Sequence, residues 1–575
     1  MFKEACLYGN TLRHIKMSQL LWRFWHRTRR RFHLYWTPRI PISPPPFDQD
    51  CVRRMKHFLQ HGNECAIHSG CDLDALRAQT ICFLGRCTEK EHCIPWRDNR
   101  YPLLWRYKLQ GFCFTRDFAI NAAADNYLGD RDRALNWISD WIQRNPVDSD
   151  AGWDAWPVSE RLLNWSMLIA VFHLHEEEVR AAFLRQMRWL KKWIEYDLRA
   201  NHLLKNACAL AVSACLVNEQ VCLAHALKLL HEQINEQILP DGGHIERSPM
   251  YHAHVLWDCL LVYAVLEEKP TFLADALIKM CAFLNTITHP DGEIPLFGDS
   301  ALKEAAPTQA LVRLAMRLLP HPKSEPGNSS VRDRHGVALE PSGYYCMGDQ
   351  TTGDFMIVKT APPLPPWQPG HSHADMLSYE LSLSGRRVIV DSGVHGYAES
   401  VLRGYCRSTR AHNTVQLDSL EQSDWWKVFR IGQRPKADTP RFEVRPDFIS
   451  LEAAYEHFSG YRHCRCIHYS PDRHYWEVED TVKVGSGSHE VKSVIHLHPE
   501  IRVTGTDREI LLSTDSVNFR ITLCTEGTLE FKDICSSGQD NWYCPEFGQS
   551  LPSATIIMRH KGASPLTIGY TIFFD

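Results

Sequence analysis

The sequence lacks any apolar run of the length that crosses a membrane. Its 575 residues contain no stretch of about 18 consecutive apolar residues, which excludes an ordinary membrane-spanning helix. It also lacks a strong excess of charge, because the formal net charge is only -4. Nothing in this balance requires nucleic acid as a partner. A chain of this length exceeds one ordinary core and predicts several domains.

Paired cysteine ligands are missing as well. The 20 cysteines form no C-x-x-C pair, and the closest two are Cys464 and Cys466. Cys208, Cys215 and Cys222 recur every seven residues in an apolar helical pattern, which indicates small core side chains. We therefore expect free thiols in a reducing compartment, hence a cytoplasmic protein, with the periplasm as the alternative.

The amino terminus lacks the features of a secretory signal, namely an uninterrupted apolar core and a small-residue cleavage site. Basic residues alternate instead with large apolar ones in the segment from Arg13 to Arg31. This pattern fits a helix that touches an anionic membrane surface, and it equally fits a solvated helix at a domain edge. We assign residues 1–50 to this basic amphipathic segment and a proline-rich linker at 36–47.

Helical periodicity dominates the next part of the chain, residues 51–330. Short breaks separate the predicted helices, which are Asp117–Gln143, Ser159–Leu174, Glu178–Tyr196, His202–Val217, Cys222–Ile238, His254–Leu266, Thr271–Ile287 and Thr308–Leu318. Tight connections of this kind predict stacked helical hairpins. The pattern leaves an open solenoid and a closed toroid as alternatives.

From residue 331 to residue 575 short alternating runs replace the helical pattern. The predicted strands include 355–358, 378–383, 448–453, 474–478, 491–497 and 567–573. Their spacing, with Gly, Asn and Asp turns between them, predicts an antiparallel β-sandwich.

Metal-ligand chemistry is concentrated early in this second half. His371, His373, Asp391 and His412 lie within about 40 residues of strand-like sequence, and zinc accepts both imidazole nitrogen and carboxylate oxygen. If His371 and His373 were in a strand they would share a face. One of the two can instead serve catalysis.

Two polar segments interrupt the helical half. Asn201 and His202 open an apolar helix, where Asn201 can also act as a cap. The second segment is a glycine turn followed by Glu246, Arg247 and Tyr251. Loop residues on a rigid helical scaffold are common positions for functional sites.

Taken together, these residues resemble the heparinase II/III superfamily of polysaccharide lyases, to which oligoalginate lyases are related. The resemblance covers most of the chain, in the family's order, through Asn201-His202, Glu246-Arg247-Ser248 with Tyr251, Gly370 to Asp375, Val390 to Gly393, and Arg407-Ser408-Thr409 with His412-Asn413-Thr414. It implies an incomplete (α/α) toroid followed by an antiparallel β-sandwich, with the active site between them. The implied activity is that of a carbon-oxygen lyase, which cleaves bacterial surface-type, glycosaminoglycan or alginate-type polysaccharides by β-elimination at a uronic acid.

The resemblance also implies roles for individual residues. Tyr251 and His371 match the catalytic residues, and Asn201 and His202 match those that face the substrate carboxylate. His373, Asp391 and His412 match the ligands of a Zn²⁺ ion, which would be structural because an elimination consumes no water.

Elementary chemistry agrees with these roles. Removing the proton next to a carboxylate adds negative charge, so the site must first neutralise that carboxylate. Tyr251 or His371 would take the proton, and a tyrosine base requires cationic neighbours such as Arg247 or His252 to lower its pKa. Further substrate contacts are expected from six residues: Arg247, Glu246, Trp153, Trp156, Arg161 and Arg407. For the two tryptophans, packing inside the helical domain is the alternative. For Arg407 the alternative is to anchor the strand.

Two other functions remain open from the sequence. A glycoside hydrolase would need two carboxylates beside the substrate, and Glu246 with Asp375 is the pair available. A non-catalytic carbohydrate-binding or assembly protein would keep the fold without turnover. In every case the expected partner is an anionic, uronate-containing glycan. The sequence leaves the sugar, endo or exo action, and a monomer or homodimer undecided.

Overall fold

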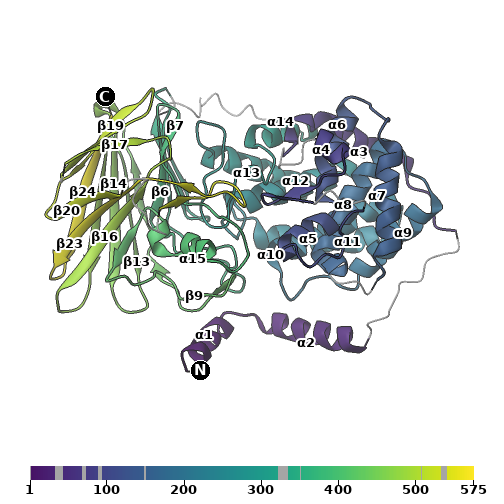
Figure 1. Ribbon diagram of the computed structural model, residues 1–575, viewed down its shortest axis with the longest axis horizontal. Helices are drawn as coiled ribbons and strands as arrows, with labels where there is room; N and C mark the ends of the chain where they lie inside the picture. Colours follow the sequence, from purple (N-terminus) through teal and green to yellow (C-terminus); the bar gives the residue numbers. More distant parts are fainter. Residues whose placement is uncertain are drawn as a thin grey trace.

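A computed structural model shows two domains side by side, one helical and one made of β-sheets (Figure 1). It describes residues 2–32, 43–67, 73–88, 93–147, 151–320, 335–349, 351–506, 508–532 and 541–574. Much of the proline-rich segment expected at 36–47 lies outside these residues. None of the described helices combines the length and hydropathy of a membrane span.

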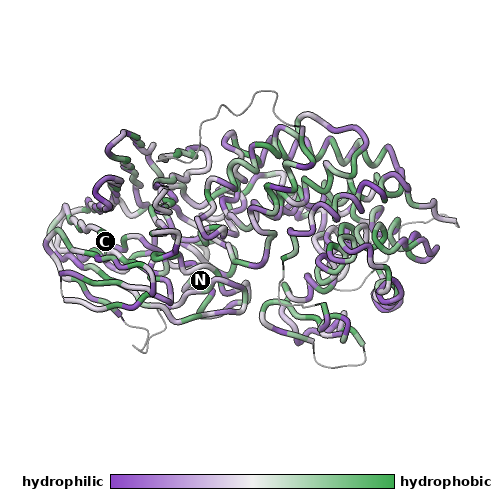
Figure 2. The backbone as a smooth tube through the Cα atoms, turned by 90° about the horizontal axis from the view of Figure 1, so that it is seen from above, coloured by the Kyte–Doolittle hydropathy of each residue, from purple (hydrophilic) through white to green (hydrophobic). Residues whose placement is uncertain are grey.

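The helical domain begins after two amino-terminal helices, α1 (Phe2–Leu12) and α2 (Met17–Phe32). Its helices are α3 (Gln49–His61), α4 (Leu73–Arg77), α5 (Leu103–Gln110), α6 (Arg116–Ala124), α7 (Arg131–Arg144), α8 (Ala155–Phe172), α9 (Glu177–Leu190), α10 (Ala200–Leu216), α11 (Gln220–Gln237), α12 (Pro249–Val265), α13 (Thr271–Ile287) and α14 (Thr308–Leu318). Hydrophobic and hydrophilic positions alternate along many of them (Figure 2), as expected for helices that bury one face.

Most of these helices follow the predicted periodicity. The predicted bounds of α13 and α14 are confirmed, whereas the single helix expected at 117–143 is wrong and divides into α6 and α7. The division follows from Asn126, whose left-handed φ of 50° ends the first helix. Cys208 and Cys222 are buried in the core, which confirms their packing role.

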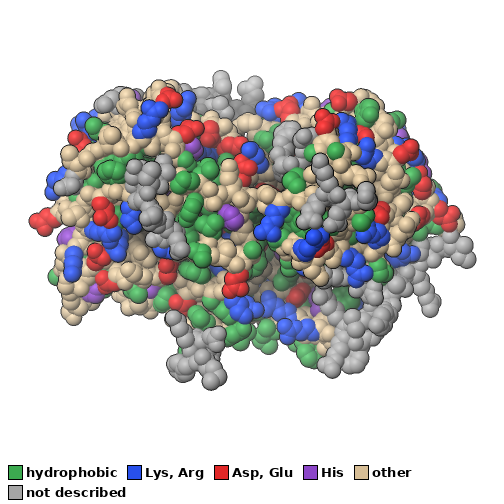
Figure 3. Space-filling view, viewed as in Figure 1, with side chains coloured by type: hydrophobic (Ala, Val, Ile, Leu, Met, Phe, Trp, Pro, Cys, Tyr) green, Lys and Arg blue, Asp and Glu red, His purple; other side chains and the backbone are tan. Residues whose placement is uncertain are grey.

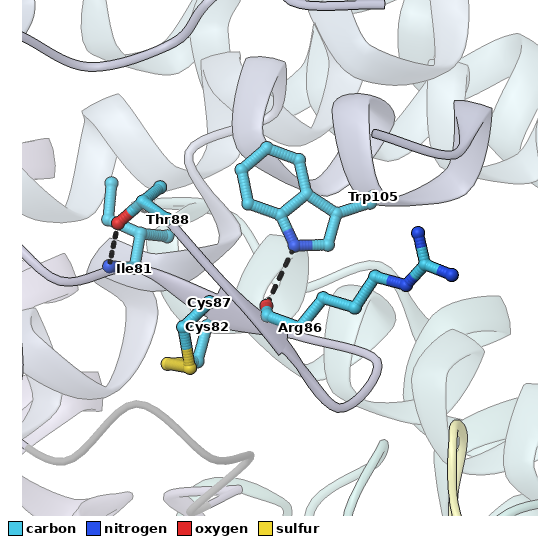
Figure 4. The surroundings of a disulfide bond; sticks show 6 residues. All are labelled: Ile81, Cys82, Arg86, Cys87, Thr88 and Trp105. Carbon is cyan, nitrogen blue, oxygen red and sulfur yellow. Dashed lines mark hydrogen bonds between the residues drawn. A yellow bond between two sulfur atoms is a disulfide. The ribbon is translucent and has the colours of Figure 1, made fainter. Parts of the chain in front are cut away.

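One pair of cysteines departs from the expected free thiols. Cys82 and Cys87 form a disulfide between two short paired strands, β1 (Cys82–Phe83) and β2 (Arg86–Cys87) (Figure 4). The hairpin is held further by Trp105, whose indole N–H donates to the Arg86 carbonyl at 3.0 Å. The pattern of spacings gave no sign of this bridge, because the two cysteines become partners only through the hairpin.

Three antiparallel sheets build the second domain. Their strands are β3 (His335–Leu339), β4 (Tyr344–Asp349), β5 (Asp354–Lys359), β6 (Ser378–Leu383) and β7 (Arg386–Ile389) in one sheet; β8 (Val415–Leu417), β16 (His489–His496), β20 (Thr528–Lys532) and β23 (Thr555–Gly562) in the second; and β11 (Lys436–Ala437), β12 (Arg441–Val444), β13 (Ile449–Glu456), β14 (Arg462–Ser470), β15 (Tyr475–Lys483), β17 (Arg502–Gly505), β18 (Glu509–Ser513), β19 (Asn518–Leu523) and β24 (Leu566–Phe574) in the third. Side chains from all three sheets share one hydrophobic core. The predicted antiparallel arrangement is confirmed.

Smaller elements complete the domain. These are helix α15 (Val401–Arg407) and the short strand pairs β9 (Trp425–Trp426) with β10 (Arg430–Ile431) and β21 (Trp542–Tyr543) with β22 (Leu551–Pro552). His371 and His373 lie in the loop between β5 and β6 and not in a strand, so the strand geometry that would place them on one face does not apply.

The two domains are joined by packing as well as by the chain. Tyr344, Cys346 and Ile357 from β4 and β5 belong to the same hydrophobic cluster as the helical core. Arg387 on β7 pairs with Asp291 in the helical domain at 2.7 Å. This shared core fixes the loops of one domain against the helix ends of the other.

Candidate active site

Tyr251 and His371 meet at the boundary between the two domains. Tyr251 lies in the first turn of α12, where the Ser248 hydroxyl accepts its backbone N–H at 3.4 Å and caps the helix. His371 comes from the loop between β5 and β6. The two rings stack with centroids 3.9 Å apart. The structure therefore brings together the two residues expected to be catalytic.

Asp299 holds His371 in place, and the sequence analysis missed it. The Asp299 Oδ2 atom lies 2.9 Å from His371 Nδ1, and Oδ1 lies 2.9 Å from His373 Nε2. Arg403 on α15 also donates to this buried carboxylate. Burial alone would raise the pKa of Asp299, but Arg403 and the two imidazoles lower it well below its usual value. A carboxylate at Nδ1 leaves Nε2 of His371 available as a proton acceptor.

The position of Asp299 depends on a close backbone approach. Gly298 has a left-handed φ of 60°, and a Cβ atom on it would lie 2.6 Å from the His371 carbonyl oxygen. The Asp299 N–H donates to that same carbonyl at 2.9 Å. Only glycine permits this contact without displacing the loop.

The surroundings of Tyr251 differ from those expected. Its hydroxyl hydrogen-bonds to the Tyr397 hydroxyl at 2.9 Å, a partner that sequence reasoning also missed. Burial raises the pKa of Tyr251. Neither predicted cation lowers it, because Arg247 points elsewhere and burial lowers the pKa of His252 to about 4. Tyr251 is thus a neutral phenol at neutral pH.

Asn201 and His202 occupy the first turn of α10. The two preceding residues, Arg199 and Ala200, adopt left-handed φ values of 63° and 49°, which are sparsely populated and typical of functional sites. Within the described residues, neither polar side-chain atom of Asn201 has a hydrogen bond of normal geometry. Trp156 lies beside His202, with ring centroids 4.7 Å apart. The expected contact residue Trp156 is therefore close to this pair.

Carboxylates around His202 favour its charged form. Burial lowers the pKa of His202, but Glu195, Glu246 and Asp197 outweigh this effect and raise it. Glu195 Oε1 lies 3.0 Å from His202 Nδ1. Burial raises the pKa of Glu246. Nearby His371, His202 and Asn201 oppose this effect, but the net shift is upward. Glu246 thus lies within electrostatic range of both His202 and His371.

Two expected substrate contacts lie instead in the helical core. Arg161 is fully buried and donates to the carbonyls of Gln110 and Gly152 at 2.6 and 3.0 Å. Trp153 is also buried, and its indole N–H donates to the Asn145 carbonyl at 3.3 Å. The substrate role predicted for Trp153 and Arg161 is corrected to a packing role.

Arg247 and Arg407 are bound to the protein backbone. Arg247 donates to the carbonyls of Ser342 and Pro341 at 2.8 Å each, which ties the start of α12 to the β domain. Arg407 is buried and donates to the Lys427 and Val428 carbonyls. Burial lowers its pKa to about 9. Both guanidinium groups position loops, so Arg247 does not make the expected substrate contact and Arg407 takes its alternative, anchoring role.

The expected zinc ligands are buried close to one another. The rings of His373 and His412 lie 5.5 Å apart, and His412 Nδ1 is 2.7 Å from Asp391 Oδ2. His373 Nδ1 and His412 Nε2 are buried without a hydrogen-bond partner among the described residues. Across that part of the chain, no three His, Cys, Asp or Glu side chains are grouped closely enough to hold a metal ion.

The carboxylate pair required by the hydrolase alternative is not available. Lys359 Nζ lies 2.7 and 2.6 Å from the two Asp375 oxygens, and the Gly298 N–H donates to the same group at 3.0 Å. Burial would raise the pKa of Asp375, but Lys359 and the nearby imidazoles lower it, which disfavours the protonated carboxylic acid that hydrolysis needs. A cavity of about 520 Å³ lies elsewhere on the β domain, beside Tyr405 and Trp425, and none of the candidate catalytic residues lines it.

Comparisons with known proteins match both domains. The model for the heparinase II/III N-terminus matches residues 86–324, and that for the heparinase II/III-like C-terminal domain matches residues 331–571. The heparin-sulfate lyase of Pedobacter heparinus is 26% identical over 331 residues, which are 51% of this chain and 49% of that protein. The heparin-sulfate lyase of Bacteroides stercoris is 23% identical over 357 residues, 53% of each chain. The chain thus matches about half the length of these curated relatives.

Solved structures share the fold. A crystal structure of heparinase III aligns with a TM-score of 0.68 at 17% identity and covers 84% of this chain and 80% of that one. A heparan sulfate lyase from Pedobacter heparinus aligns with a TM-score of 0.56 at 18% identity, over 87% and 82% of the two chains. This likeness confirms the expected fold of an incomplete toroid followed by a β-sandwich.

Proposed function

The chain belongs to the heparinase II/III family, and from this premise we propose that it is a polysaccharide lyase that cleaves glycosidic bonds at uronic acids by β-elimination. One observation carries the proposal: the Tyr251 and His371 rings stack at 3.9 Å across the domain boundary. A hydroxyl and an imidazole in contact can remove one proton and supply another on the same face of a sugar.

Carboxylate neutralisation is assigned to Asn201 and His202. The raised pKa of His202 favours an imidazolium, and neither polar side-chain atom of Asn201 has a hydrogen bond of normal geometry among the described residues. Together they can stabilise the negative charge that develops on the uronate when its C5 proton leaves. Trp156 beside His202 supplies a flat face for the sugar ring.

Proton transfer is divided between His371 and Tyr251. Asp299 accepts the Nδ1–H of His371, so Nε2 takes the C5 proton. The electron pair of that C–H bond forms the C4=C5 double bond as the C4–O bond breaks. Tyr251, a neutral phenol in the free protein, donates its proton to the departing glycosidic oxygen. No water enters the products.

The unsaturated product of each polymer identifies the substrate. Because the similar lyases are named for heparin sulfate, heparan sulfate is the first polymer for the assay, followed by alginate-type and other polyuronates. We expect one of them to yield ultraviolet absorbance from the new conjugated double bond. New reducing ends without this absorbance would instead show hydrolysis and contradict the proposal.

We also propose that His373, Asp391 and His412 hold a zinc ion, which requires these side chains to come closer together than they lie in the described structure. The support is the donor chemistry: two buried imidazole nitrogens, His373 Nδ1 and His412 Nε2, lack partners among the described residues, and the Asp391 carboxylate hydrogen-bonds the other ring nitrogen of His412. Buried polar atoms are normally paired, and zinc accepts both ligand types. When bound, the ion would supply a cross-link that stabilises the loop carrying His371.

Metal analysis of the purified protein tests this site. We expect about one zinc ion per chain, and a lower melting temperature after chelation, because structural zinc contributes to folding. His412→Ala should lose the metal, whereas His468→Ala, on the exposed side of β14, should retain it. Wild-type protein that neither contains zinc nor takes it up on addition would refute the assignment.

A further inference from the structure

The helix α2 presents large apolar side chains to solvent. Met17, Leu21, Phe24 and Trp25 have relative exposures of 70%, 65%, 71% and 53%. Their spacing of three and four residues places them on one face of the helix. Isolated exposed apolar residues are common, but a contiguous stripe of four indicates a binding surface.

The opposite face of α2 is attached to the helical domain. Trp22 stacks on Tyr196 with centroids 4.8 Å apart, and His26 lies 3.2 Å from Asp197. Arg29 also donates to the Lys192 carbonyl at 2.8 Å. These contacts fix the rotation of the helix. The apolar stripe therefore faces away from the protein in the folded state.

The preceding helix α1 is attached to the other domain. Tyr8 packs edge-on against Trp426 at 4.5 Å, and the Trp426 indole N–H donates to the Thr11 hydroxyl at 3.0 Å. Leu12, at the end of α1, is also exposed. Both helices lie along one edge, outside the two domains (Figure 1), and hydrophobic and basic side chains gather along this lower edge in Figure 3.

Charge identifies the occupant of this surface. Residues 1–32 contain eight Lys or Arg and a single acidic residue, Glu4, so they carry +7, whereas the whole chain carries -4. Arg13 and Arg27 are exposed, and no carboxylate among the described residues forms an ion pair with either. A strongly basic segment on an otherwise acidic chain complements an anionic surface.

We propose that the outer face of α1 and α2 binds an anionic lipid surface. The apolar stripe would enter the boundary between headgroups and acyl chains, with Phe24 and Trp25 at the depth that aromatic residues favour. Arg13 and Arg27 would contact the lipid phosphates. The helices form a projecting edge, which a flat bilayer surface accommodates without a matching groove. This docking surface is independent of the proposed lyase reaction.

Vesicle sedimentation with the full chain tests the proposal. We expect binding to vesicles containing roughly one third phosphatidylglycerol, and weaker binding to pure phosphatidylcholine or at high salt, because salt screens the charges. Phe24→Ser/Trp25→Ser should weaken the binding about 30-fold or more, since two large apolar side chains are lost. Arg13→Glu/Arg27→Glu should weaken it on the anionic vesicles.

The matched control is Val221→Ser/Met316→Ser, which removes two apolar side chains that are equally exposed on α11 and α14. This variant should bind as the wild type does. Equal binding by the Phe24→Ser/Trp25→Ser variant, or no binding by the wild type at low salt, would overturn the proposal. So would a concentration-dependent dimer in light scattering that this variant abolishes, because the stripe would then pair with a second copy.

Discussion

Tyr251→Phe should lower kcat by about three orders of magnitude and leave the protein folded, since loss of a positioned proton donor typically removes 10²–10⁴-fold. The substitution deletes a single oxygen atom. The phenyl ring can keep its contact with His371, and the hydrogen bond to Tyr397 is the one described interaction that is lost. The measurement is the rate of ultraviolet absorbance of the unsaturated product, with the melting temperature recorded in parallel.

Tyr397→Phe is the matched control for this result. It removes the other hydroxyl of the same hydrogen bond and leaves Tyr251 intact. We expect a loss of about tenfold or less, because Tyr397 only orients the donor. If Tyr251→Phe kept a tenth or more of the wild-type rate, another group would have to protonate the leaving oxygen, and the assignment would fail.

Periodicity predicted much of the helical domain. The apolar spacing in α13 and α14 identifies both helices because their buried faces repeat with the helical period. It failed at Asn126, where a single left-handed residue ends α6 and the chain turns into α7. Whether the helices close into a toroid depends on how they cross in space, which no local spacing encodes.

Residue type alone gave a wrong prediction for Arg161. Arginine is seldom fully buried unless it is paired, so an Arg near tryptophans suggested a substrate contact. The carbonyl groups that satisfy it, those of Gln110 and Gly152, lie 51 and 9 residues away in the sequence. No sequence motif predicts that these carbonyl groups accept hydrogen bonds from one side chain. The Arg161 guanidinium is therefore buried in the helical core.

Asp299 escaped detection for a related reason. Its partners His371 and Arg403 lie 72 and 104 residues away in the sequence. A buried imidazole needs a partner, so a carboxylate for His371 was to be expected, but the chain offers many. The local signal is the glycine before Asp299. It indicates a functional site only when the structure shows that the His371 carbonyl lies close to Gly298.

Asp299→Asn should lower both activity and stability. The neutral amide no longer fixes His371 with a free Nε2, so we expect kcat to fall about 10²-fold or more. It also leaves Arg403 buried without its carboxylate, which should lower the free energy of unfolding by about 3–5 kcal/mol. Product absorbance and denaturant unfolding measure the two effects separately.

Asp480→Asn separates catalysis from stability. Asp480 is a buried carboxylate of the same kind, paired with Arg465 at 2.7 Å and His463 at 2.8 Å inside the β-sandwich. It should lose comparable stability because a buried guanidinium again lacks its partner. Yet kcat of the folded fraction should stay near the wild-type value, because neither Arg465 nor His463 contacts Tyr251 or His371.

A second substitution in the Asp299→Asn background distinguishes an effect on His371 from an effect on folding. Arg403→Met removes the unpaired buried charge and fills a similar volume, so the double variant should regain part of the lost stability. It should not regain activity, because His371 still lacks the carboxylate at Nδ1. Recovery of kcat together with stability would mean that Asp299 acts only through folding, and that His371 needs no carboxylate to accept the proton.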